Sequence, residues 1–425
     1  MEIEKLHQRF LAHPRVCTDT RKISKDSIFF ALKGDNFNGN TYAAEALRKG
    51  AAFAVVDEDE YAISDNYILV NDTLGALQQL ATFHRNFRTA KVIALTGSNG
   101  KTTTKELINA VLSKKYRTIA TVGNLNNHIG VPLTLLTITK DTEIAIVEMG
   151  ANHQKEIESL CKIARPDFGY ITNFGKAHLE GFGGEEGVIK GKSELYDFLM
   201  ANDKSIFMNA DDSIQFQKLG DHIKKFGFSA EKKEFYRISF ASANPFVKIN
   251  VEDQTITSQL IGSYNFTNCA AAIVMGKYFN VPLSDIKKAI EGYVPKNNRS
   301  QLLEKNGHRI ILDAYNANPT SMVAALENFD GVDAVPKIAF LGDMFELGAT
   351  AAIEHQAIAD LAASMHLKDV FLIGGNFNQT DSELKSFDTF EAFSKHLTAN
   401  PIEERSTVLI KGSRGMALER ILELL

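Results

Sequence analysis

The stretch that decides the fold is Thr96-Gly97-Ser98-Asn99-Gly100-Lys101-Thr102-Thr103-Thr104, which directly follows the apolar run 92–95. Its two glycines let the backbone curl so that N–H groups face a phosphate, and a helix starting there adds its dipole. A strand, a glycine turn and a helix in this order are typical of a phosphate-binding loop (P-loop). We therefore predict a P-loop at 96–104, with a helix that begins near residue 103.

Two side chains of this loop carry its expected chemistry. Lys101 is expected to hold the β- and γ-phosphates, and the Thr102 hydroxyl to bind Mg²⁺. The loop departs from the pattern G-x-x-x-x-G-K-[ST], because Leu95 stands where the first glycine is expected. The alternative is a glycine turn that only opens a helix, but the strand, the Gly-Lys-Thr and the helix together favour a phosphate site.

Further along the chain, two strand ends offer metal ligands. Glu148 ends the apolar strand expected at 144–148, in the place of a Walker B carboxylate, and His178 follows the run 168–173 in a glycine-bearing loop. Parallel sheets bind ligands at the carboxyl ends of their strands, so we predict that both side chains hold a metal. The alternatives are a solvated strand end for Glu148 and an ordinary loop histidine for His178.

The surrounding pattern divides the chain into three α/β domains, at 1–88, 89–298 and 299–425. Residues 1–88 mix short strand-like runs with helical stretches, which indicates a small α/β module. The continuous apolar strands of the central domain indicate a parallel sheet covered on both faces. Short alternating strands at 235–261 predict an antiparallel flank on that sheet.

The last block begins after a hinge predicted at 293–299. Strands expected at 309–314, 337–342, 370–374 and 408–411 alternate with helical segments, which predicts a Rossmann-like C-terminal domain.

Composition excludes several classes of protein. The 425 residues are 44% hydrophobic and 23% charged, which is typical of a globular chain. The 47 Lys and Arg against 52 Asp and Glu give a net charge of −5, so we expect no nucleic-acid partner. The start lacks a signal-peptide layout and no apolar run approaches about 20 residues, which predicts a cytoplasmic protein without a membrane span. Cys17, Cys161 and Cys269 form no C-x-x-C pair, so neither a disulfide framework nor a zinc site is expected.

These motifs in this order resemble the Mur ligase family, the ATP-dependent amide-bond-forming enzymes of peptidoglycan precursor synthesis. The missing first glycine of the P-loop is itself typical of that family. The resemblance runs the full chain, and three segments near its end are most similar to the branch that adds D-alanyl-D-alanine. The segments are Thr18-Asp-Thr-Arg-Lys, Phe30-Ala-Leu-Lys-Gly-Asp, Gly123-Asn-Leu-Asn-Asn-His, Glu148-Met-Gly-Ala-Asn-His, Asp313-Ala-Tyr-Asn-Ala-Asn-Pro-Thr-Ser-Met, Leu341-Gly-Asp-Met-Phe-Glu-Leu-Gly and Lys411-Gly-Ser-Arg-Gly.

The resemblance implies an ATP site with two Mg²⁺ ions. Lys192 matches a lysine that is carbamoylated, and this carbamate would bind metal together with Thr102, Glu148 and His178. The residues implied at the nucleotide are those of the P-loop (Thr96, Gly97, Ser98, Asn99, Gly100, Lys101, Thr102 and Thr103) together with Asn268, Arg299 and Asp313.

The resemblance also implies roles for residues next to Asn268 and Asp313 at the nucleotide site. Asn265 belongs to the same Gly-x-x-Asn-x-x-Asn segment as Asn268, in which an amide reads adenine, and Asn265 is also a candidate helix N-cap. Tyr315 and Asn316 are expected beside the nucleotide. Ala314 departs from the familiar pattern after the aspartate but leaves Asp313 itself in place.

The resemblance implies two substrates, UDP-N-acetylmuramoyl-tripeptide and D-alanyl-D-alanine, which the enzyme would join through an acyl phosphate intermediate. We expect the protein to be a monomer. The residues expected to bind them are Thr20, Arg21, Lys33 and Gly34 for the UDP group, Asn126 and Asn127 for the muramoyl peptide, and Asp343, Glu346, Lys411, Ser413 and Arg414 for the dipeptide.

Other activities are weighed against this ligase. A Mur ligase that adds the third amino acid usually carries Asp-Asn-Pro-Arg in its last domain, which this chain lacks; a folylpolyglutamate synthase is a second relative. A guanine-specific P-loop switch would show Asn-Lys-x-Asp after a later strand, and the sequence has none. A non-catalytic nucleotide-sugar-binding protein would not need Lys101, Glu148 and Lys192 together.

Overall fold

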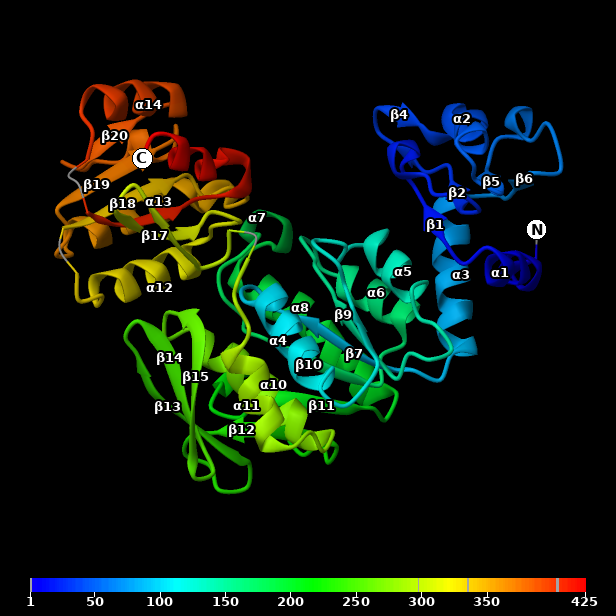
Figure 1. The fold of residues 1–425 in the computed structure, drawn as a ribbon, viewed down its shortest axis with the longest axis horizontal. Helices are drawn as coiled ribbons and strands as arrows, with labels where there is room; N and C mark the ends of the chain where they lie inside the picture. Colours follow the sequence, from blue (N-terminus) through cyan, green and yellow to red (C-terminus); the bar gives the residue numbers. More distant parts are fainter. Residues whose placement is uncertain (1, 297, 335, 403–404) are drawn as a thin grey trace.

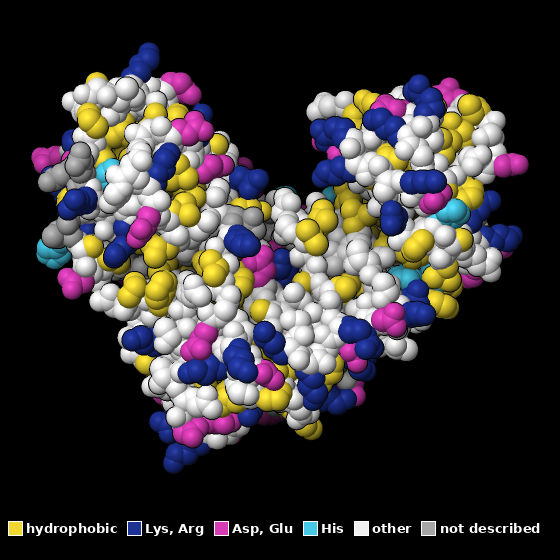
Figure 2. Space-filling view, viewed as in Figure 1, with side chains coloured by type: hydrophobic (Ala, Val, Ile, Leu, Met, Phe, Trp, Pro, Cys, Tyr) yellow, Lys and Arg dark blue, Asp and Glu magenta, His cyan; other side chains and the backbone are white. Residues whose placement is uncertain are grey.

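The computed structural model describes residues 2–296, 298–334, 336–402 and 405–425. Three α/β parts follow one another along the chain, and the first and last form two arms above the central part (Figure 1). Figure 2 shows a wide notch between these arms. The predicted hinge 293–299 includes residue 297, which lies outside the described residues. No helix in the described ranges is long and apolar enough to cross a membrane.

The N-terminal module is a four-stranded parallel sheet in the order β1-β2-β5-β6. Its strands are β1 (Val16–Cys17), β2 (Ile28–Phe30), β5 (Phe53–Val56) and β6 (Tyr67–Leu69), with a small hairpin of β3 (Lys33–Gly34) and β4 (Phe37–Asn38). Its helices are α1 (Ile3–Ala12), α2 (Ala43–Arg48) and α3 (Thr73–Phe87).

Helix α3 joins the module to the central domain. The Asp72 side chain caps it by accepting hydrogen bonds from the N–H groups of Leu74 and Gly75. Its buried face includes Leu77 and Leu80, which share one apolar cluster with residues of the central domain. The helix contacts α5 (Gly130–Leu135) and α6 (Glu156–Ala164) of that domain, and these contacts anchor the module.

The central domain is built on a nine-stranded sheet in the order β15-β14-β13-β12-β11-β10-β7-β9-β8. The six strands β7 to β12 are parallel, and β13, β14 and β15 continue the sheet as an antiparallel flank, as the sequence predicts. The strands are β7 (Lys91–Thr96), β8 (Thr118–Ala120), β9 (Ile144–Glu148), β10 (Phe168–Ile171), β11 (Ser205–Asn209), β12 (Lys225–Ser229), β13 (Tyr236–Ala243), β14 (Phe246–Val251) and β15 (Gln254–Ile261).

Helices cover both faces of the parallel part, which explains its continuous apolar strands. Along β7, Val92 and Ala94 face one apolar cluster, and Ile93 and Leu95 face the other. One face is covered by α5 (Gly130–Leu135), α6 (Glu156–Ala164) and α8 (Glu185–Ala201), and the other by α4 (Lys101–Leu112), α10 (Asn265–Tyr278) and α11 (Leu283–Glu291). Two short helices, α7 (Leu179–Phe182) and α9 (Ser213–Leu219), complete the domain.

The C-terminal domain has a six-stranded sheet in the order β16-β17-β21-β18-β19-β20. The pair β16–β17 is antiparallel and the other pairs are parallel, which confirms a Rossmann-like arrangement. The elements are β16 (Gln301–Lys305), β17 (His308–Asp313), α12 (Pro319–Asp330), β18 (Lys337–Gly342), α13 (Ala351–Ala363), β19 (Asp369–Ile373), β20 (Lys385–Phe387), α14 (Phe390–Ala399) and β21 (Thr407–Lys411).

Candidate active site

A cavity of about 1320 Å³ lies where the central and C-terminal domains meet. The carboxyl ends of β7 and β9 open into it from one side, and those of β17 and β21 from the other. It collects most of the side chains that the sequence singled out. These are Ser98, Asn99, Gly100, Lys101, Thr102, Thr103, Asn126, Asn127, Glu148, His178, Asn265, Asn268, Arg299, Asp313, Tyr315, Asn316, Glu346, Lys411, Ser413 and Arg414.

The P-loop has a backbone that only glycine can adopt at two points. Gly97 has a φ of 140°, and a Cβ there would lie 2.0 Å from the Thr172 Oγ1. Gly100 has a φ of 77° and occupies the N-cap position of α4, which therefore begins at Lys101. The helix thus starts two residues earlier than the predicted position near Thr103, because the cap glycine turns the chain directly into it.

The ammonium group of Lys101 curls back over the loop. Its Nζ donates to the carbonyl oxygens of Gly97 at 2.7 Å and Ser98 at 3.1 Å. Burial lowers its pKa to about 8; the nearby Glu148 opposes this shift and Arg299 adds to it. Thr96 and Gly97 do not line the cavity, and the Thr96 hydroxyl is buried without a partner behind the loop.

Glu148 forms the centre of a short polar network at the end of β9. Its Oε1 accepts hydrogen bonds from the Thr102 hydroxyl at 3.2 Å and the Asn126 amide at 2.8 Å. Its Oε2 is buried and has no hydrogen-bond partner among the residues that the structure describes. A buried carboxylate oxygen without a donor is costly, and a cation bound beside it would remove that cost.

Lys192 is fully buried on α8 and does not line the cavity. Its Nζ donates to the Ala151 carbonyl oxygen at 3.0 Å and lies 4.7 Å from the centre of the Phe182 ring. Burial, and then the nearby charge of Lys101, hold the pKa of Lys192 well below its usual range. This amine therefore loses its proton more readily than that of a solvated helix lysine.

His178 lies at the cavity in the left-handed backbone region, with a φ of 53°. Its Nδ1 lies 2.5 Å from Oε2 of Glu346 in the C-terminal domain, so its imidazole takes part in an interdomain contact. This contact lowers the pKa of Glu346. Within the described parts of the chain, no three His, Cys, Asp or Glu side chains lie together as a metal cluster.

Asn265 and Asn268 connect α10 to the P-loop. The Asn268 amide donates to Asn265 Oδ1 at 2.8 Å, and its own Oδ1 accepts from the Thr104 hydroxyl at 3.0 Å. The N-cap position of α10 is Tyr264, and Asn265 instead donates to the Ile261 carbonyl oxygen. The expectation that Asn265 caps the helix is therefore wrong, because the helix begins with this residue.

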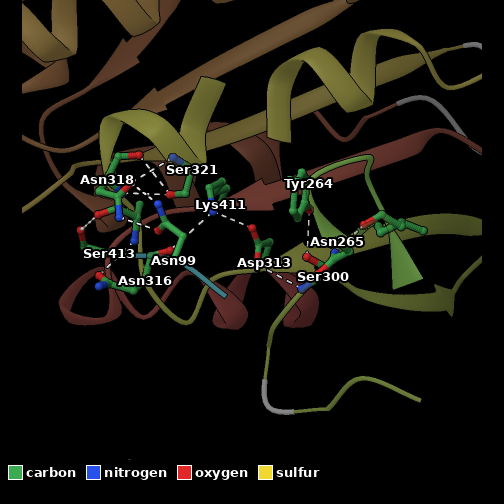
Figure 3. A network of polar contacts seen from close by, with 12 residues as sticks. Asn99, Tyr264, Asn265, Ser300, Asp313, Asn316, Asn318, Ser321, Lys411 and Ser413 are labelled. Carbon is green, nitrogen blue, oxygen red and sulfur yellow. Dashed lines mark hydrogen bonds and ion pairs between the residues drawn. The ribbon is translucent and has the colours of Figure 1, made fainter. Parts of the chain in front are cut away.

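The C-terminal wall of the cavity carries three cations and a tyrosine. The guanidinium groups of Arg299 and Arg414 lie 3.5 Å and 4.9 Å from the centre of the Tyr315 ring. The Lys411 ammonium lies 2.5 Å from Oδ2 of Asp313, whose Oδ1 accepts from a backbone N–H of Ser300 (Figure 3). Two arginines on one ring and a partly neutralised lysine create a positive wall suited to an anion.

Asp343 does not face the cleft, contrary to the sequence prediction. Its carboxylate is buried and accepts from the N–H groups of Asn376 and Phe377 and from the Asn376 amide. It therefore fixes the loop after β19 rather than a substrate. Ser413 does line the cavity, and its hydroxyl accepts from the Phe345 N–H at 3.0 Å.

Thr20, Arg21, Lys33 and Gly34 lie in the N-terminal module and do not line this cavity. The exposed Arg21 is paired with Asp19. The Lys33 ammonium lies 2.9 Å from Asp57 and 2.8 Å from Glu58, at the carboxyl end of β5. The structure thus separates these four residues from the P-loop.

Sequence reasoning missed the residues that join α12 to the P-loop. The amides of Asn99 and Asn318 pair across the two domains (Figure 3). The Thr320 hydroxyl accepts from the Lys176 N–H at 2.9 Å. The signal was an asparagine directly before a proline, which is typical of a helix N-cap followed by a proline at N1. Asn127 holds the turn that leads into α5, since its Oδ1 accepts from the N–H groups of Ile129 and Gly130.

Comparison with known proteins agrees with this architecture. Three segments match family descriptions: residues 15–85 match "Mur ligase family, catalytic domain", 95–276 "Mur ligase middle domain" and 298–414 "Mur ligase, glutamate ligase domain". The UDP-N-acetylmuramoyl-tripeptide–D-alanyl-D-alanine ligase of Bacillus subtilis is 35% identical over 424 residues, covering 96% of this chain and 92% of that protein. The enzyme of the same name from Escherichia coli is 32% identical, covering 96% and 93%.

Solved structures agree over the same length. The MurF crystal structure from Acinetobacter baumannii has a TM-score of 0.84 at 31% identity and covers 96% of this chain and 92% of its own. MurF of Thermotoga maritima, solved in complex with ADP, has a TM-score of 0.84 at 26% identity, covering 97% of each chain. With three matching domains in order and relatives above 30% identity along nearly its whole length, this chain belongs to the Mur ligase family.

Proposed function

We propose that this protein joins D-alanyl-D-alanine to the C-terminal carboxylate of UDP-N-acetylmuramoyl-tripeptide, using ATP. The products are UDP-N-acetylmuramoyl-pentapeptide, ADP and phosphate, in peptidoglycan precursor synthesis. The observation that carries this function is the similarity, over 96% of the chain, to enzymes of that name. We further propose that it acts in the cytoplasm as a monomer.

The three substrates are assigned to the three domains. Residues 1–88 would hold the UDP group through Thr20, Arg21, Lys33 and Gly34, and residues 89–298 would hold ATP on the P-loop. Residues 299–425 would bring D-alanyl-D-alanine to Ser413 and Arg414, and would place Arg299 and Asp313 against the nucleotide. The cavity between the last two domains supports this division, because it brings the P-loop and the positive C-terminal wall to one space.

The reaction requires the carboxylate to become a better acylating group. In the first step the carboxylate attacks the γ-phosphorus of ATP, and an acyl phosphate and ADP are formed. The amine of the dipeptide then attacks the acyl carbon, the tetrahedral intermediate collapses, and phosphate leaves. Lys101 and the arginines of the C-terminal wall would balance the negative charge on the phosphoryl oxygens, and no protein nucleophile is needed.

The residues at the end of β9 fit a magnesium ion. Oε2 of Glu148 is a buried oxygen without a donor, and the Thr102 hydroxyl lies beside the same carboxylate. Bound Mg²⁺ would supply positive charge at the γ-phosphate. A second ion would be held by His178 and a carbamate on Lys192.

Carbamoylation of Lys192 is supported by its environment. A neutral amine attacks CO₂, an N–C bond forms, and the amine loses a proton, leaving an anionic carbamate. Burial favours the neutral amine, because it holds the pKa of Lys192 well below its usual range. The resulting negative carbamate would then lie close to the positive charge of Lys101.

The activity is tested by measuring phosphate release from ATP with UDP-N-acetylmuramoyl-tripeptide, with and without D-alanyl-D-alanine. Release that depends on the dipeptide, together with a pentapeptide product in mass spectrometry, is the expected result. Equal release without the dipeptide and no amide product would rule out this ligase.

For the carbamate, we expect Lys192→Ala to lose nearly all activity and to regain part of it with added acetate or another short carboxylate. The neighbouring exposed Lys190→Ala is the matched control and should need no rescue. Full activity of Lys192→Ala without added carboxylate would exclude the carbamate.

A further inference from the structure

The tip of the P-loop and the start of α12 are joined by a pair of side-chain amides. Asn318 Nδ2 donates to Asn99 Oδ1 at 2.7 Å, and Asn99 Nδ2 lies 3.4 Å from Asn318 Oδ1 (Figure 3). The two residues come from different domains and lie 219 positions apart in the sequence. This pair is therefore a direct link between the ATP-binding loop and the C-terminal domain.

The orientation of the Asn318 amide is set by its own helix. Its Oδ1 accepts from the Ser321 N–H at 2.9 Å, and the Ser321 hydroxyl accepts from the Asn318 N–H at 3.1 Å, which completes a capping box. Because the amide oxygen is used at the helix end, the amide nitrogen is left to point across the interface. Any rotation of this amide would break the cap.

The other half of the pair is equally fixed. The Asn99 carbonyl oxygen accepts from the Thr172 hydroxyl at 2.6 Å and from the Asn173 amide at 3.0 Å, and its N–H donates to Asn173 Oδ1 at 3.1 Å. All three bonds use main-chain atoms of Asn99. Among the described residues, the Asn99 side chain forms hydrogen bonds only with Asn318.

The pair lines the cavity on one side and is closely packed on the side of Gly175. A Cβ added to Gly175 would lie 3.0 Å from both Asn99 Nδ2 and Thr320 Cγ2, so the two domains are in contact at this point. The Lys176 N–H donates to the Thr320 hydroxyl, and the Lys176 ammonium lies 2.8 Å from Glu354 of α13. These contacts hold the first turn of α12 in one position against the P-loop.

We propose that Asn318 is a positioning residue for the ligation, acting through Asn99. It touches neither the carboxylate nor the amine; it fixes the C-terminal wall, which carries Lys411 and Arg414, at a set distance from the P-loop. The acyl phosphate forms at the loop and the dipeptide arrives from that wall, so a shift of about 1 Å between them would slow the second step. This inference rests on the proposed ligase activity.

The test uses Asn318→Ser in the full-length protein. Serine is as good an N-cap as asparagine, but it carries no amide nitrogen to reach Asn99. The matched control is Thr389→Ser, which exchanges one capping hydroxyl for another at the start of α14. Both variants should unfold at the temperature of the wild type, so that a loss of activity in Asn318→Ser is not a loss of folding.

We expect Asn318→Ser to lower kcat/KM for D-alanyl-D-alanine by about tenfold, as the loss of one such bond implies. The Kd for ATP alone should change little, because the P-loop itself keeps its bonds. Asn99→Ala should lower the kcat/KM for D-alanyl-D-alanine by a similar factor, and the double variant should be no worse than either single one. If the two single losses of kcat/KM multiply in the double variant, the two residues act separately and the proposal is overturned.

A second measurement does not depend on turnover. Cysteines placed at the exposed Lys114 and Lys395, in a Cys17→Ser background, carry labels for a distance measurement between the central and C-terminal domains. The distribution should broaden in Asn318→Ser and stay narrow in Thr389→Ser. An unchanged distribution together with unchanged kcat/KM would overturn the positioning role. If the wild type formed no pentapeptide, the proposed ligase activity would be wrong. The distance measurement would still test whether the Asn99–Asn318 pair holds the two domains in position.

Discussion

At the scale of single residues, Gly97 shows how tightly the P-loop is built. Its φ of 140° and the 2.0 Å separation between an added Cβ and the Thr172 Oγ1 leave no room for a side chain. We expect Gly97→Ala to lower the free energy of unfolding by about 2–4 kcal/mol and to abolish ATP binding. Gly123→Ala is the control, since it also has a positive φ but no atom within 4 Å of its added Cβ; it should cost about 1 kcal/mol. If urea unfolding showed the same loss in the free energy of unfolding for both variants, the steric explanation would be contradicted.

Lys101 makes ATP binding depend on pH. The pKa of the free enzyme's Lys101 is lowered to about 8, and phosphate oxygens near the ammonium would raise it again. Binding therefore takes up a proton above pH 8, and the affinity for ATP should fall as pH rises, by up to about tenfold per unit. Calorimetry in buffers of different ionisation enthalpy would measure that proton. Lys101→Arg, which stays protonated, should give a flat profile between pH 7 and 9.5; a flat profile in the wild type would contradict the assignment.

At the scale of elements, α3 is secured to the central domain by a nearly buried ion pair. Arg85 Nη2 lies 2.7 Å from Asp167 Oδ2, and its Nε donates to the Ala164 carbonyl oxygen at the end of α6. Arg85→Ala removes the side-chain donor to the Ala164 carbonyl oxygen and leaves Asp167 Oδ2 with only the Val92 N–H, so it should lower the free energy of unfolding by about 2–3 kcal/mol. Lys204→Ala removes the more exposed partner of the same carboxylate and should cost less than about 1 kcal/mol. Thermal or urea unfolding that ranked the two variants the other way would contradict this account.

At the scale of the whole molecule, the two regions that we propose bind anions lie in different domains. Lys33 lies in the N-terminal module, whereas Lys101 lines the cavity between the other two domains. We expect Lys33→Ala to raise the KM for UDP-N-acetylmuramoyl-tripeptide about tenfold or more and to leave the Kd for ATP unchanged. Isothermal calorimetry with ATP and steady-state kinetics with the tripeptide would measure the two separately. Weaker ATP binding in Lys33→Ala would show that the two regions are not independent.

Local patterns predicted the elements and several site residues. The run of apolar residues before 96 and the glycines after it predicted β7, the P-loop and α4, because backbone geometry there depends on near neighbours. The end of β9 at Glu148 followed from the same argument. The predicted position of Asp343 was wrong, because an aspartate at a strand end can point into a cleft or into a neighbouring loop. The N–H groups of Asn376 and Phe377, which are distant in the sequence, bind its carboxylate and hold it in the loop.

The sequence by itself determined the three α/β parts, the parallel central sheet, its antiparallel flank and the identity of the P-loop, since each depends on periodicity or on local turns. Only the tertiary structure decided what depends on residues far apart in the chain. It buried Lys192 against Ala151, left Glu148 Oε2 without a donor, and paired Asn99 with Asn318 across two domains. A side chain's burial and partners are set by packing between distant elements, and no local pattern records that packing.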